Sequence, residues 1–231
     1  MPESFEPPFW NYEDLALFIG AIIPCAFLGL ILVRTLHIAN QAGRTLFFQI
    51  LIYGLLLAAL YALISLRHHR PFWRSLFSSR PVRFPLSFVL GGMLLAIATG
   101  IIGAAMGARP VTDPIRALIT SQLSLAIVMV FVVVLGPIFE ELVFRGFLLP
   151  LLVNTFGPAG GILLTALPFA LLHGAQNQWA WQQITIIGVA GAAFGYAKYK
   201  TGSTAVSTLL HSGFNLMGAI AYIVQWERGG L

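Results

Sequence analysis

The chain has 231 residues, of which 58% are hydrophobic and only 9% are charged, and its net charge is +5. A soluble domain carries about 25% charged residues, so this composition cannot cover a water-exposed surface and excludes a soluble protein. The positive charge does not indicate a nucleic-acid partner, because Lys and Arg lie in loops between apolar segments, as in cytoplasmic loops that face anionic lipid.

Apolar segments of membrane-spanning length recur along the chain, and a spanning helix needs about 20 such residues. The sequence predicts spans near residues 15–34, 45–66, 86–108, 117–136, 138–155, 158–175, 182–199 and 203–225. Pro137 separates the fourth span from the fifth, and a single long kinked helix is the alternative there. We therefore predict an all-α, polytopic transmembrane helical bundle of about eight helices, forming one integral-membrane domain over residues 1–231.

The N-terminal tail is acidic and aromatic, and it runs directly into the first apolar segment. A cleavable signal peptide would begin with basic residues, so we expect the first helix to be retained. Cys25 is the single cysteine of the chain and lies in this segment. It can form neither an internal disulfide nor a zinc site alone, and we interpret it as a packing residue.

Five arginines cluster between the second and third predicted spans: Arg67, Arg70, Arg74, Arg80 and Arg83. Such a loop is expected on the cytoplasmic side. With eight spans, both chain ends and the region of Pro137, Glu140 and His173 would then lie near the same face.

Part of this loop, residues 70–85, is expected to lie along the membrane interface. Its apolar side chains would then face lipid: Phe72, Trp73, Leu76 and Phe77. Glycines at helical spacing indicate close helix packing elsewhere, at Gly103 and Gly107 and at Gly188, Gly191 and Gly195.

Few ionisable side chains fall inside the apolar segments. Glu140 and Glu141 are the only acidic residues there, because the others lie in predicted tails or loops: Glu3, Glu6, Glu13, Asp14, Asp113 and Glu227. His173 and His211 also lie in apolar segments, unlike His37, His68 and His69. A charged group at membrane depth costs several kcal/mol unless it is paired or hydrated, so these side chains are functional candidates.

The segment PIFEELVFRGF, residues 137–147, contains an acidic doublet followed by an arginine. Glu141 and Arg145 are four residues apart, so they share one helix face and can neutralise each other. Glu140 is rotated by about 100° from Glu141 and points elsewhere, where it is available as a general base.

His211 and Asn215 are also four residues apart and share a helix face. Together they can supply two hydrogen-bond donors to a developing oxyanion. Each polar residue alone has a structural explanation: a Glu–Arg pair that fixes topology, a packed histidine, or an asparagine that joins two helices. The combination of all of them is more specific than any one.

Three short motifs resemble the CPBP family, also called the ABI family, which includes the CAAX prenyl endoproteases and bacteriocin-processing or immunity proteins. EELVFR (Glu140–Arg145) resembles the EExxxR motif, FALLH (Phe169–His173) resembles FxxxH, and HSGFN (His211–Asn215) resembles HxxxN. The motifs occur in the family's order, and the resemblance covers residues 115–225, which we take as the catalytic core.

The resemblance implies a glutamic-type intramembrane endopeptidase. Glu140 and His173 would activate a water molecule, and His211 and Asn215 would stabilise the oxyanion. Glu141, Arg145 and Phe169 would hold the site together or orient the substrate. The expected partners are membrane lipid and a membrane-anchored, optionally prenylated, peptide or protein, with no nucleic acid. The small size resembles a prokaryotic branch, which implies the plasma membrane.

Two alternatives use the same residues. A zinc protease could gather His173, His211 and a glutamate, although HExxH is absent and Asn215 is a poor zinc ligand. We favour a site with no cofactor, with zinc as the alternative. A non-catalytic immunity factor, scaffold or proton-coupled carrier is the other class, and a carrier would more often show inverted repeats, which the sequence lacks.

Overall fold

The computed structural model describes residues 7–36, 41–77, 81–108, 118–119 and 121–227, and these residues form helices and turns without any strand. The elements, in chain order, are α1 (Tyr12–Thr35), α2 (Gln41–Tyr61), η1 (Ala62–Arg67), α3 (Phe72–Leu76), α4 (Pro85–Ala105), α5 (Gln122–Val130), η3 (Phe131–Leu135), α6 (Gly136–Glu141), η4 (Leu142–Leu148), α7 (Leu149–Leu172), η5 (Ala175–Asn177), α8 (Trp181–Thr201) and α9 (Thr204–Glu227). The segments η1, η3 and η4 are π-helical turns. The predicted all-α class is therefore confirmed.

Five helical stretches of the described residues are long and apolar enough to cross a membrane: Tyr12–Thr35, Gly43–Arg67, Pro85–Ala105, Gln122–Leu172 and Thr204–Val224. The expected number of about eight spans is not confirmed. The predicted spans 117–136 and 138–155 merge within the fourth stretch, and residues 117 and 120 of the first of these spans lie outside the described part of the chain. The predicted span 158–175 falls in the second half of α7, and 182–199 falls in α8, whose polar residues lower its hydropathy.

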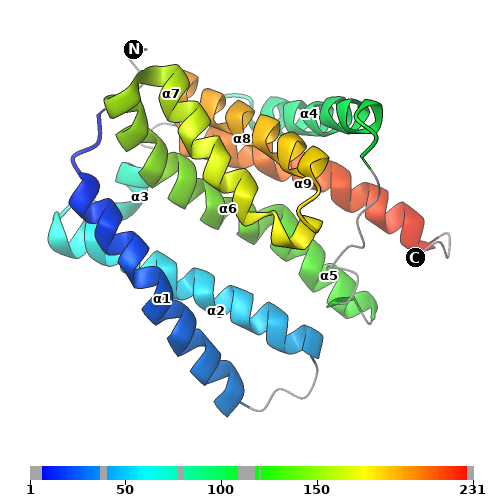
Figure 1. Cartoon of the computed structure of the whole chain (residues 1–231), viewed down its shortest axis with the longest axis horizontal. Helices are drawn as coiled ribbons and strands as arrows, with labels where there is room; N and C mark the ends of the chain where they lie inside the picture. The colour runs from blue at the N-terminus through cyan, green and yellow to red at the C-terminus, as the bar shows by residue number, and fades with distance from the viewer. Residues whose placement is uncertain (1–6, 37–40, 78–80, 109–117, 120, 228–231) are drawn as a thin grey trace.

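The chain does not break at Pro137, where a boundary between spans was predicted. Pro137 lies in the first turn of α6, directly after the π-helical turn η3, and the widened turn accommodates a residue that lacks an N–H. The break comes instead at Gly157, whose backbone angles (φ 72°, ψ 175°) are non-helical and favour glycine. Pro158 follows and starts the second half of α7, and the chain reverses direction there (Figure 1).

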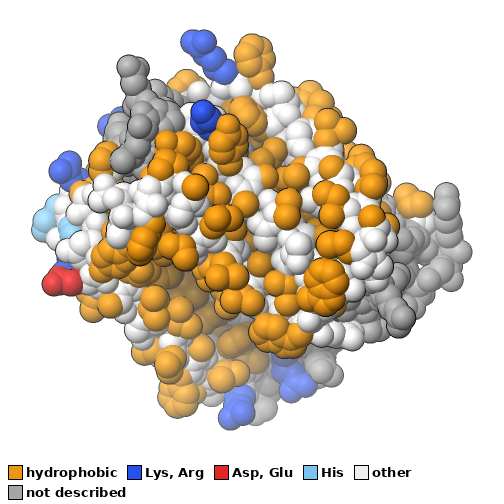
Figure 2. All heavy atoms as spheres, turned by 45° about the horizontal axis from the view of Figure 1, so that its top comes forward, with side chains coloured by type: hydrophobic (Ala, Val, Ile, Leu, Met, Phe, Trp, Pro, Cys, Tyr) orange, Lys and Arg blue, Asp and Glu red, His pale blue; other side chains and the backbone are white. Residues whose placement is uncertain are grey.

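The helices α1 and α2 form a hairpin that lies beside the remaining helices (Figure 1). A buried cluster that includes Trp10, Phe18, Leu60, Ile64 and Phe147 joins the start of α1 and the end of α2 to η4. In the rest of the bundle, α4 packs along α9 and α7 packs along α8. Hydrophobic side chains cover most of the face in Figure 2, and Lys and Arg lie toward its edges, as expected for a protein surrounded by lipid.

Asp14 was expected in the N-terminal tail, but it lies fully buried in the first turn of α1. Its carboxylate is 3.1 Å from Arg67 Nε and 2.9 Å from His68 Nε2. Asn11 caps the same turn by accepting hydrogen bonds from the backbone amides of Glu13 and Asp14. These contacts fasten the start of α1 to the end of η1, which explains why a charged residue is tolerated inside.

The expectation that Phe72 and Leu76 face lipid is wrong, because both side chains are buried in the cluster that joins the hairpin to η4. Trp73 is 59% exposed and points outward, as predicted. The close approach of α3 depends on Gly146, where a Cβ would lie 2.7 Å from the Leu76 carbonyl oxygen. The short helix is therefore packed against the protein on one side and exposed on the other.

The closest helix crossing joins α4 to α9 at two glycines that the sequence analysis did not single out. A Cβ added at Gly92 would overlap the Leu210 carbonyl oxygen, and one at Gly213 would overlap the Val89 carbonyl oxygen. Four of the five predicted packing glycines are also in contact, and a Cβ at Gly191, for example, would lie 3.0 Å from the Phe169 ring. The prediction is wrong for Gly107, which follows the end of α4 and has no atom within 4 Å of an added Cβ. Small residues thus allow backbones to touch, as in other membrane helices.

Gly92→Ala is expected to destabilise the protein by about 1–3 kcal/mol, because the added methyl group must push α4 away from α9. The measurement is the thermal unfolding midpoint in detergent. Gly100→Ala is the matched control on α4, since an added Cβ there meets no described atom within 4 Å. That control should leave the midpoint unchanged or raise it slightly. Equal midpoints for the two variants would contradict the close crossing.

Candidate functional site

Glu141 and Arg145 form the buried ion pair that their spacing predicts. Arg145 Nη1 donates to Glu141 Oε1 over 2.7 Å, and both side chains are 0% exposed. Glu141 ends α6 and Arg145 lies in η4, so the pair spans the junction of the α-helical and π-helical turns. Breaking such a pair would leave an uncompensated charge inside the protein.

Aromatic rings and a backbone carbonyl complete the surroundings of Arg145. Its guanidinium carbon lies 4.3 Å from the ring centroid of Phe169 and 5.4 Å from that of Phe194. Arg145 Nη2 also donates to the Gly191 carbonyl oxygen over 2.8 Å. The absence of a side chain at Gly191 is what lets the guanidinium approach α8, because a Cβ there would lie 3.2 Å from Nη2. Arg145 thus ties η4 to α7 and α8.

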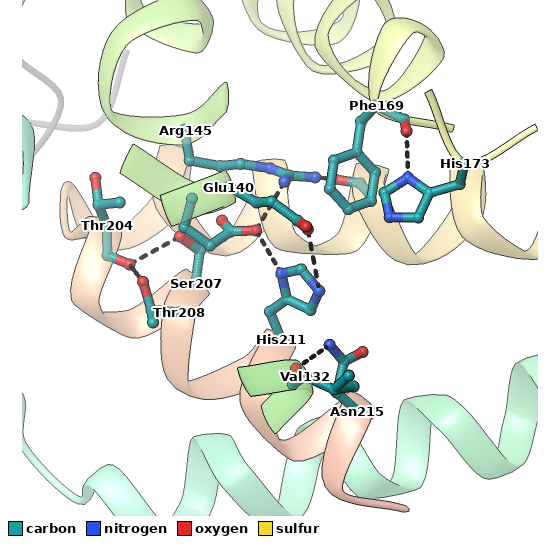
Figure 3. A network of polar contacts seen from close by, with 12 residues as sticks. Val132, Glu140, Arg145, Phe169, His173, Thr204, Ser207, Thr208, His211 and Asn215 are labelled. Carbon is teal, nitrogen blue, oxygen red and sulfur yellow. Dashed lines mark hydrogen bonds and ion pairs between the residues drawn. The ribbon is translucent and has the colours of Figure 1, made fainter. Parts of the chain in front are cut away.

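His211 of α9 lies between the two glutamates. Figure 3 shows its imidazole beside the Glu140 carboxylate. Its Nδ1 is 3.0 Å from Glu141 Oε1, and its Nε2 is 3.8 Å from Glu140 Oε2. The imidazole stacks on Phe194 with a centroid distance of 4.6 Å and an interplanar angle of 19°. Because Glu141 is paired with a permanent cation, it accepts the Nδ1 proton, which directs Nε2 toward Glu140.

Glu140 has different neighbours from Glu141, as the rotation between adjacent helical residues requires. Its side chain is 17% exposed, and its Oε1 accepts a hydrogen bond from the Tyr53 hydroxyl over 3.0 Å. Tyr53 belongs to α2 and was not identified from the sequence. One carboxylate is therefore held by an arginine inside the protein, while the other faces His211 and a tyrosine at a less buried position.

His173 caps the end of α7 beside Phe169. Its Nδ1 is 2.7 Å from the Phe169 carbonyl oxygen, which can only accept, so the proton lies on Nδ1 and Nε2 is left as an acceptor. The Asn177 amide donates to the His173 carbonyl oxygen over 2.8 Å. In Figure 3 the imidazoles of His173 and His211 and the Glu140 carboxylate extend toward a common region beside Phe169. The ring centroid of Phe169 is 4.9 Å from that of His173 and 5.7 Å from that of His211.

Asn215 lies one helical turn beyond His211, and its amide donates to the Val132 carbonyl oxygen over 2.9 Å (Figure 3). In the π-helical pattern, Gly136 N–H bonds to the Phe131 carbonyl oxygen, so the next residue would serve Val132. That residue is Pro137, which has no N–H. The Asn215 amide supplies the missing donor, and its second N–H is what could serve an oxyanion.

The structure thus gathers residues of the three motifs, although they lie on different helices. Glu140, Glu141, Arg145 and His211 are connected directly, and Phe169 lies between His211 and His173. Tyr53 is the neighbour that the sequence analysis missed. Its only signal is a polar hydroxyl inside an apolar segment, which does not distinguish it from an interfacial or packed tyrosine.

A metal centre is not indicated by these positions. Among the described residues, no group of three or more His, Cys, Asp or Glu side chains could hold a metal ion. His211 Nδ1 faces Glu141 and His173 Nδ1 faces a backbone carbonyl, so only the Nε2 atoms of the two histidines are available as ligands. The three-ligand zinc site considered from the sequence stays an alternative prediction.

Comparison with known families matches residues 122–217 to the type II CAAX prenyl endopeptidase Rce1-like family. The matched segment contains all three motifs and leaves α1, α2 and α4 outside. No curated protein and no solved structure matches the chain.

Proposed function

From the match of residues 122–217 to the CAAX prenyl endopeptidase family and from the site geometry, we propose that the chain is an intramembrane peptidase that hydrolyses a peptide bond with a water molecule activated by Glu140 and His173. The observation that supports this most directly is the division between the two glutamates. Glu141 is occupied by Arg145 and His211, whereas Glu140 is directed at the Nε2 side of His211 and is partly exposed.

Glu140 and His173 serve as the acceptors for the attacking water. The Glu140 carboxylate and the His173 Nε2 atom can each accept one hydrogen bond from the same water molecule, which leaves an oxygen lone pair for the substrate carbonyl. As the water oxygen bonds to the carbonyl carbon, one water proton passes to Glu140. When the C–N bond breaks, Glu140 returns a proton to the leaving amine, so peptide and water become a carboxylic acid and an amine.

His211 supplies the positive charge that the oxyanion needs. Two ionised glutamates, Glu140 and Glu141, and the cation Arg145 carry a net charge of −1. The cluster of these three side chains and His211 is therefore neutral only when it binds one further proton. Net neutrality is favoured where water is scarce, and His211 is flanked by both carboxylates, at 3.0 and 3.8 Å. A proton on Nε2 makes this atom a donor that binds the oxyanion, with the second N–H of Asn215 beside it.

The proposed substrate is a membrane-associated peptide with a prenylated C-terminal segment, because that is the substrate class named in the matched family. The proposed site needs no metal and lies near the cytoplasmic face of a prokaryotic plasma membrane. The test uses an internally quenched peptide that ends in a farnesylated cysteine and three further residues. Inside-out membrane vesicles should cleave the added peptide in the presence of a chelator, and sealed right-side-out vesicles should not.

Three results would oppose the proposal. No cleavage by purified protein in lipid would favour a non-catalytic scaffold, loss of activity in chelator with recovery on zinc addition would favour a metalloprotease, and cleavage by right-side-out vesicles alone would reverse the orientation.

His173→Ala is expected to lower kcat for this probe by about 10²-fold, because one of the two acceptors for the water is removed. The unfolding midpoint should stay unchanged, since His173 is only partly buried. His69→Ala is the matched control, because His69 is exposed and lies outside the site. Full turnover by purified His173→Ala would remove this residue from the mechanism.

A further inference from the structure

Tyr53 connects the α1–α2 hairpin to the site, although α2 lies outside the segment that matches the family. Its hydroxyl donates to Glu140 Oε1 over 3.0 Å, across 87 residues of sequence. Residues 122–217 are therefore not the whole of the Glu140 environment, and the hairpin supplies one of its contacts.

The ring of Tyr53 is fixed by stacking. It lies 3.8 Å from Phe139 by ring centroids, with an interplanar angle of 16°, and 5.6 Å from Phe131 with an angle of 27°. Phe139 directly precedes Glu140 in α6, so the stacked ring and the carboxylate are positioned by the same turn. The stacking sets where the hydroxyl is, and it would persist if the hydroxyl were removed.

The hydrogen bond between Tyr53 and Glu140 has a fixed direction, with the hydroxyl as donor and the carboxylate as acceptor. Gln49, one turn earlier on α2, hydrogen-bonds to the same hydroxyl. A tyrosine oxygen that accepts from an amide has its single proton available for one acceptor, which here is Glu140 Oε1. The other carboxylate oxygen, Oε2, is the one at 3.8 Å from His211 Nε2. The two oxygens of Glu140 thus have separate neighbours.

We propose that Tyr53 is a positioning residue for Glu140. By holding Oε1, it orients the carboxylate so that Oε2 faces His211 and the reacting water, and it does so from outside the segment that matches the family. The inference rests on the proposed function, because it assigns Tyr53 a role through the proposed base. It also predicts that the matched segment without the hairpin would have a misoriented Glu140.

The test is Tyr53→Phe in the full chain, assayed with the internally quenched farnesylated peptide. This variant keeps the stacked ring and removes only the donor. We expect kcat to fall by about 10- to 100-fold, the effect of one hydrogen bond to a charged group, while KM changes by less than about twofold. The unfolding midpoint should equal that of the wild type. Tyr61→Phe is the matched control on the same helix, because Tyr61 is half exposed and its ring contacts Phe72.

Each other outcome overturns the inference. An unchanged kcat means that Glu140 needs no positioning by Tyr53, and a raised KM with unchanged kcat means that Tyr53 contacts substrate. A fall in activity that follows a lowered unfolding midpoint means a structural role. Glu140→Gln in the same assay separates this inference from the proposed function: if it is inactive while Tyr53→Phe is fully active, only the role of Tyr53 fails. If Glu140→Gln is fully active, the proposed function fails as well.

Discussion

Glu140→Gln is expected to lower turnover of the farnesylated peptide by about 10³-fold or more, because the amide cannot take a proton from the attacking water. The measurement is kcat of the purified variant in lipid, with the unfolding midpoint recorded on the same sample. The reaction should also fail at high substrate concentration, since the defect is in chemistry and not in binding.

The fold should survive this change, which makes the loss of activity interpretable. A glutamine carbonyl oxygen can still accept from Tyr53, and the Glu140 side chain is 17% exposed, so no buried charge is left unpaired. Glu13→Gln is the control, because Glu13 is 77% exposed and belongs to the Arg67 ion pair at the start of α1. A Glu140→Gln protein that is folded and turns over at the wild-type rate would eliminate the general base from the mechanism.

Arg145→Ala should have the largest effect on stability, about 3–5 kcal/mol of unfolding free energy. It leaves Glu141 as an unpaired charge at a 0% exposed position, and it removes the hydrogen bond to Gly191 and the stacking on Phe169. The expected result is a lowered unfolding midpoint and a lower yield of folded protein in detergent.

Two further variants test whether the unpaired buried charge of Glu141 causes the loss of stability in Arg145→Ala. Arg74→Ala removes an exposed arginine and should leave the midpoint unchanged. Replacing Arg145 by Met and Glu141 by Gln together should recover part of the stability lost in Arg145→Ala, because neither charge is then left alone. An Arg145→Ala protein as stable as the wild type would show that the buried pair does not form.

The pairing within EELVFR could be predicted because it depends on local spacing alone. Residues four apart on a helix are neighbours, and adjacent residues point in different directions, so Glu141 was expected to meet Arg145 and Glu140 was expected to face elsewhere. The π-helical turn η4 does not alter this, since the 2.7 Å contact forms across it. Sequence spacing does not identify the neighbours of Glu140, because Tyr53 is 87 residues away and belongs to no motif.

The contact of Asn215 could not be predicted from the sequence, for a different reason. The HxxxN spacing correctly places Asn215 on the same helix as His211, but its partner depends on the backbone of another helix. A sequence does not reveal that η3 is π-helical and that Pro137 therefore leaves the Val132 carbonyl without a donor. The oxyanion role of Asn215 stays a prediction. The same side-chain amide also has a structural role, because it donates a hydrogen bond to the Val132 carbonyl oxygen.

The number of about eight spans is not confirmed, for a related reason. A helix boundary at Pro137 was predicted, with a single long kinked helix as the alternative, and the structure agrees with the alternative there, because the chain reverses at Gly157, twenty residues later. Some prolines are accommodated by a widened helical turn, and others end a helix. Composition alone does not distinguish the two cases. Conversely, the buried Asp14 looked like part of an exposed tail, because its partners Arg67 and His68 come from the end of the neighbouring helix in the hairpin.

The most direct test of the mechanism is an experimental structure of the protein in lipid at a resolution that reveals ordered water. The account predicts one water molecule within about 2.7–3.2 Å of both the Glu140 carboxylate and His173 Nε2, with His211 Nε2 nearby. A site filled by aliphatic side chains or lipid between these groups, or a metal ion bound to them, would contradict it.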